Sequence, residues 1–283
     1  IELSSFQLEL LNKAKIDVGV ILNISDDHMD RYDSFTQYFQ AKAKLFDVSE
    51  INIINRDDEK LDALKHKANL SFGISESHDK EDYILTNNNF ASFVERGGDF
   101  SVELKSLKLI GEHNKLNIMA AIACMQSTFP KFNQFKINNL KNINHRLEWL
   151  KNKQGIDFYN DSKATNVNAT ITALKSFDKK NIFLIVGGDS KNQILKPLER
   201  YLKQTVSALY LIGQDAHIFE ENFNFIKSLK ITNYKLMRDA VLAAYEDAEA
   251  GDIVLLSPAC ASYDMYKDYK ERGNEYKSIV EEL

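Results

Sequence analysis

One short polar run in the second half of the chain has the residue types to bind a charged ligand. It combines two amides, a carboxylate, an ammonium group and two hydroxyls, in the order Asn160-Asp161-Ser162-Lys163-Ala164-Thr165-Asn166. Residues 167–177 have the pattern of a helix, so these groups precede a helix N-terminus, where backbone N–H groups favour anions. The run therefore predicts a loop that binds a carboxylate or a phosphate, with an ordinary helix cap as the alternative.

Two further loops of the second half have similar chemistry. Residues 187–191, Gly-Gly-Asp-Ser-Lys, follow the predicted strand 182–186, and Lys191 offers a point charge to an anion. Residues 257–264 follow the predicted strand 253–256 and are rich in small and hydroxyl-bearing residues. Because the parallel strands of a doubly wound sheet end at one edge, we expect all three loops to converge there.

A carboxylate-rich loop in the first half could hold a hard cation. Three aspartates and His28 lie within residues 26–30, directly after the predicted buried strand 17–24. Ligands of parallel α/β sheets bind at the carboxyl ends of strands, and hard cations take oxygen ligands directly or through water. The alternative is a solvated loop in which Asp30 and Arg31 interact with each other.

Two other residues of the first half have little meaning alone. Glu2 could supply a second carboxylate to a cation, but an exposed terminal glutamate is the default interpretation. Lys42 lies in the predicted helix 34–46, where a lysine is normally a solvated face residue. From the residues themselves, neither position predicts a site.

Side chains near the middle of the chain could contact a nucleotide. Asn114 and Asn117 are three residues apart near a helix start, so they share one face and could bind a base or ribose; capping is the alternative. Arg146 could bind a phosphate through two parallel hydrogen bonds, with an interdomain salt bridge to Glu148 or another acid as the alternative. Neither the Gly-x-x-x-x-Gly-Lys-Ser/Thr loop nor the Gly-x-Gly-x-x-Gly fingerprint occurs in the sequence.

Strands alternate with helices along most of the chain, which favours an α/β fold with mostly parallel sheets in two domains. In the first half, residues 51–55 read as a buried strand, 83–104 as an antiparallel ribbon turning at Gly97-Gly98, and 116–125 as an apolar helix. The second half alternates strands 182–186, 208–212 and 253–256 with helices 194–202, 216–223 and 241–248, and ends in an amphipathic segment from Asp264. A change of pattern places the boundary so that the domains are residues 1–144 and 145–283.

Composition argues against several classes of protein. The net charge is −5 and the basic residues are scattered, which disfavours broad nucleic-acid binding. No apolar run is long enough to cross a bilayer, and no signal peptide is recognisable. The two cysteines, Cys124 and Cys260, lack metal-type spacing and suit a reducing cytoplasm; Cys260 has small neutral neighbours and reads as structural. Without an initiator Met, and with first residues that look like part of an element, the sequence is expected to be a fragment.

Together these motifs resemble the Mur ligase family. The matching stretches follow the family's order over nearly the whole chain: residues 2–8, 27–32, 111–117, 145–148, 160–166, 187–191, 257–264 and 272–275. The Asn-Asp-Ser-Lys-Ala-Thr-Asn run resembles the branch that adds D-glutamate, because sister ligases and folylpolyglutamate synthases typically carry an Asp-Tyr-Ala-His type sequence there. The resemblance implies an incomplete central ATPase domain, with a mostly parallel sheet and a small antiparallel ribbon, followed by a Rossmann-like doubly wound C-terminal domain. It also implies that the UDP-binding N-terminal domain and the ATP phosphate loop are missing.

The resemblance implies ATP-dependent amide bond formation in peptidoglycan precursor synthesis. In the family, ATP phosphorylates the carboxylate of UDP-N-acetylmuramoyl-L-alanine, since a free carboxylate is a poor electrophile, and the amine of D-glutamate attacks the acyl phosphate. Mg²⁺ neutralises the charge that accumulates as phosphoryl groups approach. We therefore expect ATP and Mg²⁺ as cofactors, small-molecule substrates, a cytoplasmic monomer, and a fragment that is inactive by itself.

The resemblance also assigns roles to individual residues. Glu2 and His28 match magnesium-linked positions, and Lys42 matches the lysine that is carbamylated in the family, with Lys44 as the fallback because the spacing from His28 is one residue short. The nucleotide-side positions are Asn114, Asn117, Arg146 towards the phosphates and Asp161 towards the ribose. The D-glutamate positions are Lys163, Thr165, Lys191, Ser262, Tyr263 and Tyr269, of which the two tyrosines replace a Leu and a Phe of well-known relatives. No residue is assigned as a general base.

Two other functions compete with this hypothesis. A sister ligase such as a folylpolyglutamate synthase would share most of the motifs but is disfavoured by residues 160–166. A non-catalytic module that binds a dicarboxylate would need only the second half of the chain, and the missing phosphate loop keeps that alternative open.

Overall fold

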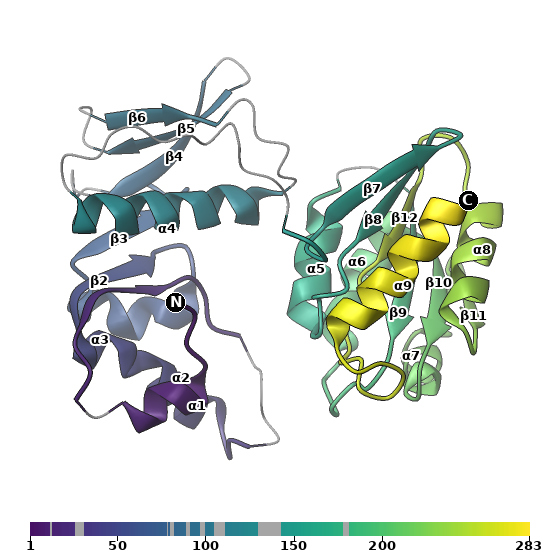
Figure 1. Ribbon diagram of the computed structural model, residues 1–283, viewed down its shortest axis with the longest axis horizontal. Coiled ribbons are helices and arrows are strands. Elements are labelled where there is room, and N and C mark those ends of the chain that lie inside the picture. Colours follow the sequence, from purple (N-terminus) through teal and green to yellow (C-terminus); the bar gives the residue numbers. More distant parts are fainter. Residues whose placement is uncertain are drawn as a thin grey trace. The chain divides into compact units, whose positions relative to one another are not determined.

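The computed structural model describes residues 1–11, 13–25, 31–77, 79, 82–88, 91–96, 100–104, 111–129, 143–177 and 181–283. The chain forms two compact units, Ile1–Leu140 and Lys141–Leu283, and each unit has its own six-stranded sheet (Figure 1). Both sheets are mixed but mostly parallel and are packed with helices, so the predicted α/β class is confirmed.

The first unit is built around a sheet with the strand order β1-β2-β3-β4-β5-β6. Strands β1 to β4 pair in parallel, whereas β4, β5 and β6 pair antiparallel. Its described elements are α1 (Ser5–Leu10), β1 (Ile16–Ile21), α2 (Phe35–Ala43), α3 (Leu45–Val48), β2 (Ser49–Asn55), the 3₁₀ helix η1 (Glu59–Lys67), β3 (Leu70–Gly73), β4 (Tyr83–Asn88), β5 (Ala91–Arg96), β6 (Phe100–Glu103) and α4 (Glu112–Thr128).

Alternation along β2 explains how this sheet is covered on both faces. Ile53 is fully buried in a cluster with α4 residues such as Met119, and α4 lies alongside β3 and β4 (Figure 1). The next residue, Ile54, is buried in a second cluster with α2, α3 and η1. Because successive side chains of a strand point to opposite faces, this apolar run supplies both cores.

The second unit has the strand order β11-β10-β9-β12-β8-β7, in which only the edge strand β7 runs antiparallel to its neighbour. Its elements are β7 (Glu148–Lys153), β8 (Ile156–Asn160), α5 (Val167–Lys175), β9 (Ile182–Gly187), the 3₁₀ helix η3 (Lys196–Leu198), α6 (Glu199–Thr205), β10 (Val206–Ile212), α7 (Ala216–Phe223), β11 (Lys230–Asn233), α8 (Met237–Asp247), β12 (Ile253–Leu256) and α9 (Tyr269–Glu282).

The direction of the crossovers distributes the helices over the two faces of this sheet. Connections through α5, α6 and α7 move the chain from β8 towards β11, and α8 returns it to β12. Since such crossovers are right-handed, α8 lies on the face opposite to the other three helices. The main core confirms this, because it joins α8 and α9 to one side of β9, β10 and β12, and α9, drawn in yellow, passes in front of the sheet (Figure 1).

Several predicted boundaries were wrong for local reasons. The strand predicted over 17–24 ends at Ile21, and the Ile24 N–H instead donates to the Asp58 carboxylate over 2.9 Å. The helix predicted over 34–46 is divided at Lys44, where α2 ends and α3 begins. The ribbon predicted over 83–104 contains three strands, and its predicted Gly97-Gly98 turn lies outside the described residues.

Four strands were not predicted at all: β3, β7, β8 and β11. The last residue of β8 is Asn160, so the polar run described above begins inside the sheet rather than after it. In the part of the chain that the structure describes, no helix combines the length and apolarity needed to span a membrane.

Candidate functional site

Three loops of the second unit meet at the carboxyl-terminal edge of its sheet, as predicted. The Asp161 N–H donates to the Leu256 carbonyl over 2.7 Å, and the Gly187 N–H donates to the Pro258 carbonyl over 2.9 Å. Asp189 and Ala261 exchange backbone hydrogen bonds of 3.0 and 2.9 Å. Residues 161–166, 187–191 and 257–264 therefore form one continuous structure, which we call the three-loop rim.

Part of the polar run is structural rather than free to bind a ligand. Asn160 is fully buried, and its amide nitrogen lies 3.0 Å from His145 Nδ1 and donates to the Gly273 carbonyl over 3.1 Å. Ser162 is also fully buried and donates to the Tyr269 carbonyl over 2.8 Å. Asn166 caps α5 by accepting from the Ala169 N–H over 2.9 Å, so the helix-cap alternative holds for this residue.

Asp161 is a buried carboxylate at the end of β8. One oxygen accepts from the Ser257 hydroxyl over 2.8 Å, and the other accepts from the Leu147 N–H over 3.1 Å. Burial raises the pKa of the Asp161 carboxyl to about 7, while these hydrogen bonds and the charge of Arg146 oppose the rise. Asp161 is therefore poised to change its charge near neutral pH.

Lys163 and Tyr269, both predicted to contact D-glutamate, are close together in the structure. The Lys163 ammonium lies 4.3 Å from the centre of the Tyr269 ring, within cation–π range. The same ring meets His145 edge-on at 6.0 Å between ring centres. Both residues are half-buried.

The other four predicted D-glutamate residues differ in exposure. Thr165 is half-buried and Lys191 is exposed, with a left-handed backbone at Lys191 (φ 49°). Ser262 is buried, and its carbonyl accepts from the backbone N–H groups of Met265 and Tyr266. Tyr263 is 71% exposed, so its ring has no packed position within the unit.

Arg272 of α9 is a buried cation beneath the rim; it lies in the matching stretch 272–275, but the sequence assigned it no role. It is 1% exposed and donates to the Ser162 hydroxyl (3.0 Å), the Ser162 carbonyl (2.9 Å) and the Ala261 carbonyl (3.3 Å). Burial lowers the pKa of its guanidinium to about 10. Arg272 therefore joins the first and third loops of the rim and adds positive charge under them.

Cys260 lies in the third loop and is completely buried. Burial raises the pKa of its thiol, which keeps the sulfur protonated and unreactive. This agrees with the structural interpretation made from its neutral neighbours.

Asn114 and Asn117 lie in the first turns of α4 in the first unit. Asn114 is half-buried and Asn117 is exposed. The N-cap is Gly111 (φ 92°), which has no side chain to cap the helix. Capping and nucleotide binding by the two amides both stay predictions.

Arg146 is exposed, and its predicted alternative partner is occupied elsewhere. Glu148 accepts from the His145 N–H over 3.0 Å and forms a 3.3 Å ion pair with Lys277. No ion pair links Arg146 to any residue within the described ranges. Its guanidinium is thus available to an anion.

The predicted magnesium-linked residues belong to the first unit and are only partly described. Lys42 extends from α2 and donates to the Leu3 carbonyl over 3.3 Å, which places its ammonium beside the segment that carries the exposed Glu2. His28 lies outside the described residues, as do the aspartates of residues 26–30. Lys44 reaches a different segment, the carbonyl of Glu9, over 3.3 Å.

Arg31 and the described acidic residues bear on the predicted cation site near Lys42. Arg31 does not depend on Asp30 for a partner, because it pairs with Glu9 over 3.0 Å and lies over the Phe6 ring. Among the residues that the structure describes, no group of three His, Cys, Asp or Glu side chains could hold a metal ion. A carbamate on Lys42 would add the acidic oxygens that such a site needs for a hard cation.

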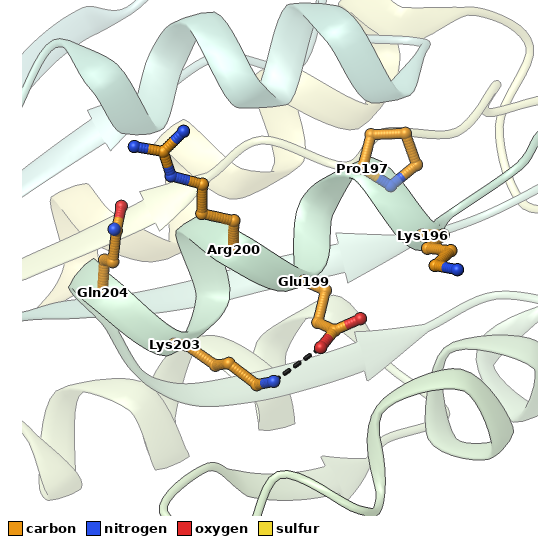
Figure 2. Close-up of a pocket in the computed structure, with 6 residues that line it drawn as sticks. All are labelled: Lys196, Pro197, Glu199, Arg200, Lys203 and Gln204. Atoms are coloured by element: carbon orange, nitrogen blue, oxygen red, sulfur yellow. Dashed lines mark hydrogen bonds and ion pairs between the residues drawn. The ribbon is translucent and has the colours of Figure 1, made fainter.

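One hollow of the second unit does not coincide with the rim. It lies on η3 and α6 and is lined by Lys196, Pro197, Glu199, Arg200, Lys203 and Gln204 (Figure 2). Glu199 and Lys203 form a 2.5 Å ion pair there. None of the predicted site residues lines this hollow, so it is an exposed helix surface rather than part of the candidate site.

Comparison with known proteins places both units in one family. The profile described as the Mur ligase middle domain matches residues 1–125, and that of the Mur ligase glutamate ligase domain matches residues 145–260. The chain belongs to the Mur ligase family.

Relatives within the Mur ligase family are similar over the whole chain. The UDP-N-acetylmuramoylalanine--D-glutamate ligase of Coxiella burnetii is 36% identical over 292 residues, covering 100% of this chain and 64% of that protein. The Nitrosomonas europaea protein of the same name is 34% identical over 288 residues, covering 99% of this chain and 61% of that protein. The chain thus spans less than two thirds of the length of these relatives.

The structure of a MurF ligase from Thermotoga maritima in complex with ADP shares the fold of this Mur ligase chain. The TM-score is 0.69 with 18% identity, and the match covers 95% of this chain and 63% of that chain. The compact units divide at Leu140, whereas the domain matches leave residues 126–144 unassigned. The boundary at residue 144 and the roles of individual residues stay predictions.

Proposed function

We propose that the full-length protein carrying this chain joins D-glutamate to UDP-N-acetylmuramoyl-L-alanine, using ATP. The proposal is carried by one observation: the relatives that share 34% and 36% identity over essentially the whole chain bear the name of that ligase. The three-loop rim supports it, since the rim gathers cations and hydroxyls that suit a dicarboxylate.

In the proposed reaction, the carboxylate of the L-alanine moiety takes the γ-phosphoryl group of ATP and becomes an acyl phosphate. The amine of D-glutamate then attacks the acyl carbon, and the tetrahedral intermediate releases phosphate as the amide forms. Positioning contributes strongly to such a step, because a bound amine reacts at a high effective concentration. The use of nucleotide substrates suits a cytoplasmic enzyme.

The rim residues would bind and orient D-glutamate. Lys163 and Lys191 would each bind a carboxylate, and the hydroxyls would fix its orientation. The proposed set is Lys163, Thr165, Lys191, Ser262, Tyr263 and Tyr269. Ser262 is buried, so it would contact the ligand from within the rim, whereas the exposed Tyr263 would cover a bound ligand.

Nucleotide binding is proposed for Asn114, Asn117, Arg146 and Asp161. The exposure of Arg146 supports a phosphate contact, because Arg146 forms no ion pair with a described acid. Asp161 already accepts two hydrogen bonds, so a ribose hydroxyl would have to share its oxygens.

Glu2, His28 and Lys42 are proposed to hold magnesium, with Lys42 as a carbamate. Bound magnesium would neutralise phosphate charge during the transfer. Lys42 fits this role through its contact with Leu3, one residue from Glu2, and the donor set of carboxylate and carbamate oxygens suits a hard cation. Lys44, which reaches Glu9, is the weaker candidate.

Phosphate release by the full-length protein tests the proposed reaction. The assay contains ATP, Mg²⁺, UDP-N-acetylmuramoyl-L-alanine and either D- or L-glutamate, and we expect release with D-glutamate alone. Turnover of a folate with L-glutamate would identify a sister ligase instead. Release with none of these substrates would leave a binding module as the better description of the second unit.

A further inference from the structure

Gln193 lies two residues after Lys191, in a segment that none of the recognised motifs includes. Its half-buried side chain contacts the second and third loops of the rim and the first residue of α5, which directly follows the first loop. The side-chain oxygen accepts from the Val167 N–H, directly after the first loop, over 3.0 Å. The side-chain nitrogen donates to the Ser190 carbonyl of the second loop over 3.0 Å and to the Ala259 carbonyl of the third loop over 3.4 Å.

These partners fix the orientation of the Gln193 amide. The Val167 group that faces the amide is an N–H donor. The Ser190 and Ala259 groups that face it are carbonyl oxygens, which can only accept. A flipped amide would set its oxygen against two carbonyl oxygens and its nitrogen against an N–H group, losing every bond. One orientation therefore satisfies the whole network, although the 3.4 Å bond is the weakest of the three.

The backbone that Gln193 contacts is held in conformations that non-glycine residues rarely adopt. Lys191, Asn192 and Ala259 have φ values of 49°, 57° and 58°. Left-handed conformations are unfavourable for most side chains and persist only where the surroundings enforce them. The Ser190 carbonyl, just before Lys191, accepts from both the backbone and the side chain of Gln193. Losing these bonds would let the segment that aims Lys191 relax.

We infer that Gln193 is a positioning residue that holds the three loops in the register needed to bind a dicarboxylate amino acid. It acts through Lys191 and its neighbours rather than by touching the substrate. Glutamine is suited to this position because it offers an acceptor and two donors at one end of a flexible chain. The substrate part of the inference rests on the proposed function.

Gln193→Met tests the inference in the full-length protein, because methionine keeps the length of the side chain and removes all three hydrogen bonds. We expect the KM for D-glutamate to rise roughly tenfold, which corresponds to about 1.4 kcal/mol. A change of this size is reasonable for the loss of two or three hydrogen bonds, because each makes a small net contribution. The KM for ATP should change less than twofold. Gln193→Glu should behave similarly, since a carboxylate would face two carbonyl oxygens.

Gln204→Met is the matched control. Gln204 is exposed on α6 beside the hollow of Figure 2 and belongs to no loop of the rim. The KM of the Gln204→Met variant for D-glutamate should therefore equal that of the unsubstituted protein. An unchanged KM for D-glutamate in Gln193→Met would overturn the inference. Equal rises in both KM values with a lowered Tm would also overturn it, because they would indicate a general structural role.

Hydrogen exchange at the Val167 amide separates this inference from the proposed function. Exchange should be at least tenfold faster in Gln193→Met than in Gln204→Met, since Val167 donates to the replaced oxygen. Equal exchange rates would show that Gln193 does not hold the loops. If the unsubstituted protein forms no product with D-glutamate, the proposed function fails, and the exchange rate still decides whether Gln193 joins the loops.

Discussion

The Lys42 ammonium lies 3.3 Å from the backbone oxygen of Leu3, beside Glu2 in the sequence. If this lysine carries a carbamate that binds magnesium, Lys42→Ala should abolish amide formation by the full-length protein. Acetate or formate should then partly restore the rate, because a free carboxylate can replace the missing oxygens. The rate of product formation with and without these acids measures the effect.

Lys44→Ala is the control for this experiment. Lys44 follows Lys42 by two positions but contacts a different segment, at the Glu9 carbonyl. It should retain activity and gain nothing from added acids. Full activity of Lys42→Ala, together with acid-dependent activity of Lys44→Ala, would move the role to Lys44.

Asp161 should make the stability of the second unit depend on pH. Its carboxyl holds a proton up to about pH 7 when folded, against a pKa of 3.8 for the model compound. Between these values the folded state binds more protons than the unfolded chain, so its contribution to the free energy of unfolding falls as the pH rises. The slope is at most about 1.4 kcal/mol per pH unit.

Urea denaturation from pH 4 to pH 8 measures this contribution as the difference between Asp161→Asn and the unsubstituted protein. The variant should gain relative stability up to about pH 7 and show a constant difference above it. Arg146→Ala should extend the pH-dependent range upwards, because Arg146 lowers the pKa of the Asp161 carboxyl. A difference that does not vary with pH would contradict the shifted titration.

The sequence could assign roles to rim residues within continuous motifs, but it could not show which residues join the loops. Lys163 and Asp161 lie within one recognisable run. Arg272 and Ser162, in contrast, are 110 residues apart, and Gln193 and Ala259 are 66 apart. Nothing in the local sequence around Gln193 or Arg272 specifies these partners, because the partners meet only when the sheet is assembled.

At the scale of elements, α9 approaches the end of β8 through Gly273. A Cβ atom at this position would lie 2.2 Å from His145 Nδ1 and 3.0 Å from the Ser162 Cβ. Gly→Ala within a helix normally stabilises by about 1 kcal/mol, but overpacking a tight contact costs about 1–3 kcal/mol. We expect the clash to dominate, so that Gly273→Ala destabilises the second unit by about 1 kcal/mol or more.

Thermal unfolding of Gly273→Ala, with Ser278→Ala as control, checks this prediction. Ser278 is exposed on the same helix, so alanine there should leave Tm unchanged or raise it slightly. A Tm for Gly273→Ala at or above that of the control would mean that His145 moves aside without cost.

Elements with strong apolar patterns were predictable, whereas those defined by pairing were not. Strands β9 and β12 are buried at every position, which their apolar runs indicated. Strand β7 reads Glu-Trp-Leu-Lys-Asn-Lys, because it forms the antiparallel edge of the sheet and only Glu148 is buried. The division at Lys44 has no Gly or Pro to mark it, and Lys44 itself keeps helical dihedrals.

At the scale of the whole molecule, each compact unit has its own buried core. We therefore expect two calorimetric transitions, one from each unit. Met119→Ala should lower the midpoint temperature of the first unit's transition, and Ile185→Ala should lower that of the second unit's transition. Both side chains are fully buried, and large-to-small changes at such sites cost about 2–5 kcal/mol. If either substitution lowered both transitions equally, the units would unfold as one cooperative structure instead.

The two cysteines are divided between the units, half-buried Cys124 on α4 of the first and fully buried Cys260 in the rim of the second. A maleimide reagent would consequently label Cys124 on the native protein and reach Cys260 only when the rim opens. The chain thus carries an internal reporter of rim opening that needs no introduced probe. Protection of Cys260 by a ligand would reveal occupancy of the rim without any measurement of catalysis.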